Sequence, residues 1–161
     1  MENDNFTTLE QGAWGGLLGM HGRMMRLIDA DLQAHSHISH VEFEVLLRLS
    51  WEADHRLRIH DLAARSVLTR SGISRLVERL EQAGLVVREK ATEDRRGAYA
   101  VLTEAGMTHF EAALRQHVAF VRRHFLALFS EAELEQMAVF WQRVETGQAN
   151  LESGDNTRPE N

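Results

Sequence analysis

Residues 56–103 read RLRIHDLAARSVLTRSGISRLVERLEQAGLVVREKATEDRRGAYAVLT and contain the pattern that decides the fold. Leu57 and Ile59 alternate with a charged residue, which predicts a short strand, and the next residues predict a helix of two turns. A second helix is expected to begin after Thr69, a residue type that caps helix N-termini, and to end at Gly84, a residue type that stops helices. The sequence therefore predicts two short helices joined by a tight turn.

The second of these helices has two chemically different faces. One face carries a stripe of apolar residues that we expect to be buried: Ile73, Leu76, Val77 and Leu80. The opposite face is polar and basic over its first two turns. Arginine offers paired donors to guanine edges or phosphates, and hydroxyls and helix N-terminal amides suit phosphate oxygens. The candidate DNA-contacting residues on this face are Thr69, Arg70, Ser71, Ser74, Arg75 and Arg79.

Two runs typical of β-strands follow, residues 85–87 and 98–102, and a charged loop joins them. A hairpin in this position is a wing, and an arginine on a wing can enter the minor groove of DNA and respond to its negative potential. A carboxylate facing phosphates is repelled, so we expect Asp94 to hold an arginine through an ion pair. The candidate wing residues are Lys90, Asp94, Arg95 and Arg96.

The charge of the chain is unevenly distributed. The net charge of −6 argues, by itself, against binding to nucleic acid, because phosphate neutralisation drives that affinity. Residues 58–103, however, hold nine Arg or Lys against six Asp or Glu, a net charge of +3. The rest of the chain holds nine basic and 18 acidic residues, a net charge of −9. The positive charge is therefore concentrated in the segment that resembles a DNA-binding head.

Long helices are predicted on both sides of this head, in residues 8–52 and 104–146. Ser39 is a candidate cap for a helix that begins near His40, and the helix that begins at Glu104 is expected to continue to about Phe129. Their apolar stripes exceed what a head of under fifty residues can cover, which favours a homodimer over packing within one chain. We expect a mainly α (α+β) fold in which residues 1–161 form one domain: a winged helix-turn-helix at 57–103 with long N- and C-terminal dimerisation helices. Residues 147–161 are polar, and a disordered tail is expected there.

The first half of the N-terminal helix contains five glycines, at positions 12, 15, 16, 19 and 22. Each glycine inside a helix costs about 0.5–1 kcal/mol relative to alanine, so a compensating contact is expected. Either this half approaches a partner helix or a ligand closely, or it is a loosely held arm. The candidate ligand-binding residues, chosen for aromatic and polar character near the junction with the head, are Trp14, His21, Met24 and Trp51.

Several function classes find no support in the sequence. The absence of Cys removes disulfides, thiolate metal sites and thiol nucleophiles. No Walker loop, GxSxG elbow, HExxH or dinucleotide-binding glycine pattern is present, so we expect no enzyme activity and no cofactor. His35, His37 and His40 lie together but lack the spacing of a helical HxxxH site, so no metal site is assigned. No secretory signal or run of about 18 apolar residues occurs, so a cytoplasmic protein without membrane association is expected.

The run SVLTRSGISRLVERLEQAGLV, followed by DRRG and then AVLT, resembles the MarR family of winged-helix transcriptional regulators. An Asp-x-Arg pattern marks the wing in that family and falls on Asp94 and Arg96 here. The resemblance spans Thr8 to about Thr146 and is strongest at 57–103. It implies a homodimer that binds a pseudopalindromic operator and is released by a small, often aromatic or phenolic, effector. Members that sense oxidants need a cysteine, which this chain lacks.

The resulting hypothesis is a dimeric repressor that binds double-stranded DNA and responds to a small molecule. Two alternatives share the fold: a metal-responsive regulator that uses the histidines, and a winged-helix module that binds only protein. A hydrolase that uses histidine and carboxylates would need an unrecognised site. The operator, the effector and the choice between repression and activation stay open.

Overall fold

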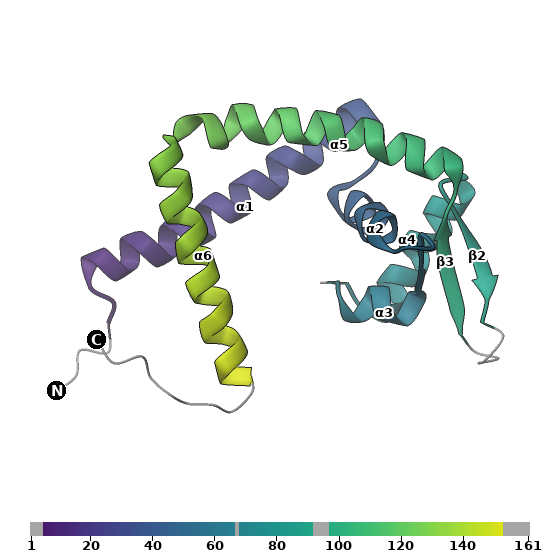
Figure 1. The fold of residues 1–161 in the computed structure, drawn as a ribbon, viewed down its shortest axis with the longest axis horizontal. Coiled ribbons are helices and arrows are strands. Elements are labelled where there is room, and N and C mark those ends of the chain that lie inside the picture. Colours follow the sequence, from purple (N-terminus) through teal and green to yellow (C-terminus); the bar gives the residue numbers. More distant parts are fainter. Residues whose placement is uncertain (1–4, 67, 92–96, 153–161) are drawn as a thin grey trace. The chain divides into compact units, whose positions relative to one another are not determined.

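The computed structural model describes residues 5–66, 68–91 and 97–152, and the chain is mainly helical with one small sheet, as the sequence predicts (Figure 1). It divides into two compact units between Phe120 and Val121. The elements, in chain order, are α1 (Thr8–Ser36), α2 (His40–Trp51), β1 (Arg56–Arg58), α3 (Ile59–Ala64), α4 (Arg70–Gln82), β2 (Val86–Lys90), β3 (Ala98–Leu102), α5 (Glu104–His124), the 3-10 helix η1 (Leu126–Leu128) and α6 (Glu131–Glu152).

The sheet is antiparallel and has the strand order β1-β3-β2. β2 and β3 form the predicted hairpin, in which Val86 pairs with Leu102 and Lys90 pairs with Ala98. The Ala91 amide donates to the Gly97 carbonyl across 3.0 Å and so closes the hairpin at the base of its loop. β2 extends to Lys90, three residues beyond the predicted run, while Ile59 lies in α3 instead of in the predicted first strand.

The helix-turn-helix consists of α3 and α4, and both predicted ends of α4 are confirmed. The Thr69 hydroxyl accepts a hydrogen bond from the Gly72 amide at 3.2 Å, which satisfies one free N–H at the helix start. Gly84 follows the helix with φ of +73°, a left-handed conformation that glycine adopts without steric cost. The predicted apolar stripe is buried: Ile73, Leu76, Val77 and Leu80.

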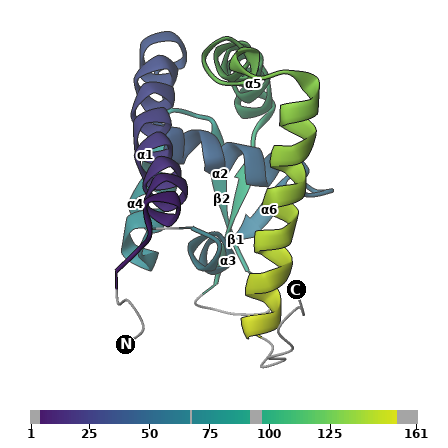
Figure 2. The ribbon, with the colours of Figure 1, turned by 90° about the vertical axis from the view of Figure 1, so that its left-hand side faces the viewer.

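α2 lies between α1 and the sheet and carries part of the core of the first unit (Figure 2). Ser39 caps it as predicted, in a capping box in which Glu42 accepts from both the amide and the hydroxyl of Ser39 at 2.8 Å. The buried Phe43 ring lies 5.5 Å from Phe110 and 4.9 Å from His117, measured between centroids. These rings connect α2 to α5.

A tight backbone junction connects α5 to the end of the helix-turn-helix. The Thr103 amide donates to the Leu85 carbonyl at 3.1 Å, and the Thr103 hydroxyl reaches the Gly84 carbonyl at 2.8 Å. One turn into α5, a Cβ on Gly106 would lie 2.0 Å from the Leu85 carbonyl oxygen, where no side chain fits. A glycine at position 106 is therefore what permits α5 to begin so close to Leu85.

Two predicted boundaries in the C-terminal part need correction. The helix predicted to continue to about Phe129 ends at His124, and Phe125 leaves helical geometry and packs edge-on against Phe129. Arg122, Arg123 and His124 form its last turn, where cations complement the helix dipole. The disordered tail predicted from 147 starts too early, because α6 continues to Glu152 despite the low helix propensity of Gly147. Residues 153–161 lie outside the described residues.

None of the helices within residues 5–66, 68–91 and 97–152 combines the length and the apolar composition that crossing a bilayer requires.

Candidate nucleic-acid interface

The start of α4 presents a polar, basic face to solvent. Arg70, Ser71 and Arg75 are exposed and Ser74 is half-buried. The hydroxyls of Thr69 and Ser71 lie 3.1 Å apart, beside the first amides of the helix. Neither Arg70 nor Arg75 has a hydrogen bond or an ion pair with any residue that the structure describes, so both guanidinium groups can bind an external anion. The structure thus brings together five of the predicted residues.

Arg79, the sixth residue predicted on this face, has an intramolecular partner. Its Nε donates to a carboxylate oxygen of Glu42 at 3.0 Å, which links α4 to the start of α2. Burial favours the neutral acid at Glu42, but hydrogen bonds from Ser39 and the charge of Arg79 together hold the Glu42 pKa below its usual value of 4.5. Arg79 therefore belongs to a contact between helices, whereas Arg70 and Arg75 do not.

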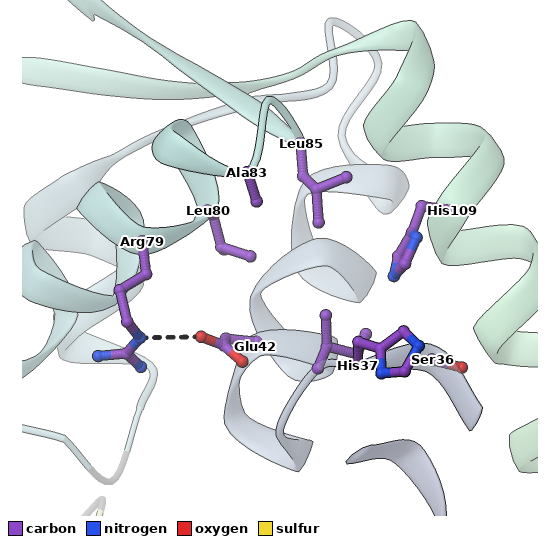
Figure 3. Close-up of a pocket in the computed structure, with 9 residues that line it drawn as sticks. Ser36, His37, Glu42, Arg79, Leu80, Ala83, Leu85 and His109 are labelled. Atoms are coloured by element: carbon purple, nitrogen blue, oxygen red, sulfur yellow. Dashed lines mark hydrogen bonds and ion pairs between the residues drawn. The ribbon is translucent and has the colours of Figure 1, made fainter. Parts of the chain in front are cut away.

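A cavity of about 330 Å³ lies beside this ion pair (Figure 3). Its lining comes from the ends of α1 and α4 and the residues that follow each, from Glu42 of α2, and from α5, which contributes His109. A second cavity adjoins it and also has Glu42 and Arg79 in its lining. Neither cavity is lined by any of the predicted ligand-binding residues Trp14, His21, Met24 and Trp51. Trp14 and Trp51 are instead exposed on α1 and at the end of α2, while Met24 is buried.

The β2–β3 hairpin holds the second group of predicted DNA-contacting residues. Lys90 is exposed at the end of β2, where the loop begins. Asp94, Arg95 and Arg96, which the sequence predicts as wing residues, lie outside the described residues. The structure therefore places the base of the predicted wing next to α4, and the roles of the three loop residues stay predictions.

Sequence reasoning missed Arg88, a residue of β2. Its backbone amide donates to one oxygen of Glu81 at 3.2 Å, and its Nε lies 3.4 Å from the other. Its terminal nitrogen donates to the main-chain carbonyl of Ser74. No local pattern could identify this role, because the contact depends on how the strand packs on the helix.

The sheet also holds a basic cluster that the sequence did not predict. The Arg56 guanidinium lies 4.0 Å from the Tyr99 ring centroid and pairs with Glu89 at 3.6 Å. The Arg58 Nε donates to the Tyr99 hydroxyl at 3.2 Å. These contacts connect β1, β2 and β3 at the point where the chain enters α3.

Metal binding finds no site in the part of the chain that the structure describes. Within those residues, no three His, Asp or Glu side chains come close enough together to hold a metal ion. His35 instead lies 3.2 Å from Asp31 of the same helix, and His60 lies 3.1 Å from Asp61.

The first turns of α4 are capped and exposed, and their arginines lack partners among the residues that the structure describes. Together with the support helix before it and the hairpin after it, α4 defines a winged helix-turn-helix DNA-binding protein. Comparison with known proteins gives its family. The MarR family model matches residues 38–97. AbsC, a MarR family transcriptional regulator from Streptomyces coelicolor, is 32% identical, with 92% of this chain and 99% of AbsC covered and a TM-score of 0.80. The chain belongs to the MarR family.

Two further relatives agree with this assignment. Sco3205, a MarR family regulator from Streptomyces coelicolor solved in complex with DNA, is 28% identical over 90% of this chain and 91% of its own, with a TM-score of 0.80. The HTH-type transcriptional regulator MhqR of Bacillus subtilis is 28% identical over 76% of this chain and 84% of its own. The protein is accordingly a DNA-binding transcriptional regulator and not an enzyme.

Proposed function

We propose that the protein is a homodimeric repressor that binds a pseudopalindromic operator through α4 and the β2–β3 hairpin of each subunit. The observation that carries the proposal is the pair of arginines, Arg70 and Arg75, that lack partners among the described residues on the exposed start of α4. In a symmetric dimer the two α4 helices enter successive major grooves about 10 base pairs apart. The loop between β2 and β3 then reaches the flanking minor groove through Arg96.

Dimerisation is supported by apolar surface that a single chain leaves exposed. Every residue of α1 from Thr8 to His21 is exposed, including Trp14, Leu17 and Leu18. A glycine-rich helix exposed on every side gains little stability in water, because isolated helices depend on packing of an apolar face. α6 likewise exposes Val139, Phe140, Trp141, Val144 and Leu151. In a symmetric dimer, the exposed surfaces of α1 and α6 in one subunit would be covered by the same surfaces of the other subunit.

A small aromatic or phenolic effector would act by changing the spacing of the two α4 helices. A coupling of about 1–3 kcal/mol between effector and operator is enough for release. The residues proposed for the effector site are Trp14, His21, Met24 and Trp51. The choice rests on the aromatic and polar character of these side chains, since aromatic rings give an aromatic ligand a large contact area.

The test is a fluorescence anisotropy titration of a labelled fragment from the region upstream of the gene, at fixed ionic strength. Arg70→Ala and Arg75→Ala should each weaken binding by about 1–3 kcal/mol if the arginine contacts a base, since paired donors to guanine are lost. Arg115→Ala on α5 is the matched control, because it removes an exposed arginine outside α4 and the hairpin. Equal losses for all three variants would contradict the proposed interface.

A further inference from the structure

Arg88 holds α4 at two points that are two turns apart. Its guanidinium group reaches the Ser74 carbonyl, while its amide and Nε both face the Glu81 carboxylate. Residues seven apart lie on one side of a helix, so Ser74 and Glu81 form a single ridge along α4. One side chain of the hairpin thus fixes both the distance and the direction of β2 relative to this ridge.

The same face of β2 carries Lys90. Side chains two residues apart on a strand point to the same side, so Lys90 lies on the face that Arg88 uses to touch α4. The register places Arg88 opposite Ala100 and Lys90 opposite Ala98, one step nearer the loop. The orientation that Arg88 imposes on β2 is therefore transmitted directly to the Lys90 ammonium group.

The contacts of Arg88 also argue against a direct role in binding phosphate. The Arg88 guanidinium already forms an ion pair with Glu81, and its terminal nitrogen already donates a hydrogen bond to the Ser74 carbonyl. Turning this side chain toward DNA would leave the Glu81 carboxylate without its cationic partner and close to the negatively charged DNA.

We propose that Arg88, together with Glu81, is a positioning residue that fixes the orientation of the β2–β3 hairpin relative to α4. In this orientation Lys90 contacts a phosphate while Arg70 and Arg75 contact the major groove. The inference rests on the proposed function, because it requires DNA to bind α4 and the hairpin at the same time. It assigns to Arg88 an effect on DNA affinity that acts through Lys90.

The experiment compares salt dependence in a double-mutant cycle. Lys90→Ala in the wild-type background should reduce the slope of log affinity against log salt by about 2, because each of the two subunits loses one phosphate contact worth about 1. In the Arg88→Ala background, Lys90→Ala should leave the slope unchanged, since Lys90 is already misplaced. Arg75→Ala should cause the same fold-loss in both backgrounds, because α4 keeps its own contact with the groove.

Glu81→Gln separates positioning from direct contact. If Arg88 positions the hairpin, removing its carboxylate partner weakens DNA binding several-fold, although the protein has lost a negative charge. If Arg88 instead binds phosphate, Glu81→Gln leaves the affinity unchanged or raises it. That result, or a Lys90 contribution that persists in Arg88→Ala, overturns the inference.

Folding is checked by circular dichroism, and Arg88→Lys replaces Arg88→Ala in the cycle if the alanine variant unfolds. Failure of the proposed function is recognisable separately, because Arg75→Ala would then have no effect in the wild-type background either.

Discussion

Gly106 permits the close junction between the helix-turn-helix and α5, because it has no side chain. A Cβ there would lie 2.0 Å from the Leu85 carbonyl oxygen and 2.9 Å from the Leu102 side chain. Gly106→Ala should therefore destabilise the protein by about 1–3 kcal/mol, the range for overpacking a well-packed site. Urea unfolding followed by circular dichroism measures the change.

Gly147→Ala is the matched control for this substitution. Gly147 is also helical, but nothing lies within 4 Å of its Cβ position. Alanine there should stabilise the protein by about 0.5–1 kcal/mol through helix propensity alone. A similar loss of stability in both variants would mean that the Leu85 contact is not the cause.

At the residue scale, the sequence predicts local contacts well and distant ones poorly. The caps at Ser39 and Thr69 and the stop at Gly84 follow from residue types that act on their own neighbours, and the structure has all three. The roles of Arg88 and Gly106 depend on packing between elements, which no local pattern encodes. The candidate ligand residues were chosen by character alone, and three of the four, Trp14, His21 and Trp51, are exposed.

At the element scale, Glu42 joins α2 to α4 and makes this joint sensitive to acid. Its pKa lies below 4.5 in the folded protein, so its contribution to stability is present above that pH and is lost as pH falls through the lowered value. Glu42→Gln should lower the melting temperature at pH 7, and the difference from wild type should shrink below pH 4.5.

The packing of α2 on α5 responds to pH in a different range. Burial, reinforced by the charge of His40 and opposed by Asp31, lowers the pKa of His117 below its usual value of 6.5. The unfolded chain then binds more protons than the folded one, so stability should fall as pH drops below 6.5.

His117→Phe keeps a ring against Phe43 and removes the titration. Its melting temperature should change less between pH 7 and 5 than that of wild type, as followed by circular dichroism. An NMR titration of the His117 imidazole gives the pKa itself, and a value at or above 6.5 would refute the explanation.

Element boundaries expose the limit of propensity arguments. The apolar stripe from Met107 onward continues past His124, and it therefore predicted one helix where the backbone changes direction at Phe125. At the other end, polar composition predicted disorder from 147, although α6 continues to Glu152. Polar or apolar composition indicates whether a segment is exposed to water. It does not indicate where the backbone hydrogen bonds of a helix end.

At the scale of the whole molecule, the proposed dimer predicts that stability depends on protein concentration, because association favours the folded state by mass action. Phe140 is 53% exposed in the single chain, and a charge in its place would be buried in a dimer. Phe140→Glu should give a monomer by sedimentation velocity, with a melting temperature that no longer rises with concentration.

Gln142→Glu is the control for this substitution, since it adds the same charge to an exposed polar position of α6. It should leave the sedimentation coefficient unchanged. A wild-type protein that sediments as a monomer at micromolar concentration would refute the dimer.

The sequence predicted the fold class and the order of the head elements because each depends on residues that are close in the chain. The concentration of positive charge in residues 58–103 reconciles DNA binding with a net charge of −6. The residues of the proposed effector site could not be predicted in the same way, because a site formed by side chains of separate helices leaves no local pattern in the sequence.

The hydrogen bond between Ala91 and Gly97 has a consequence for evolution. It ties the hairpin at a fixed point, so the strand register up to that point does not depend on the length or sequence of the five residues between. Insertions and substitutions there leave the anchoring of β2 on α4 intact. If the proposed interface is correct, exchanging this loop should change the preference for flanking operator sequence while the preference set by α4 is kept.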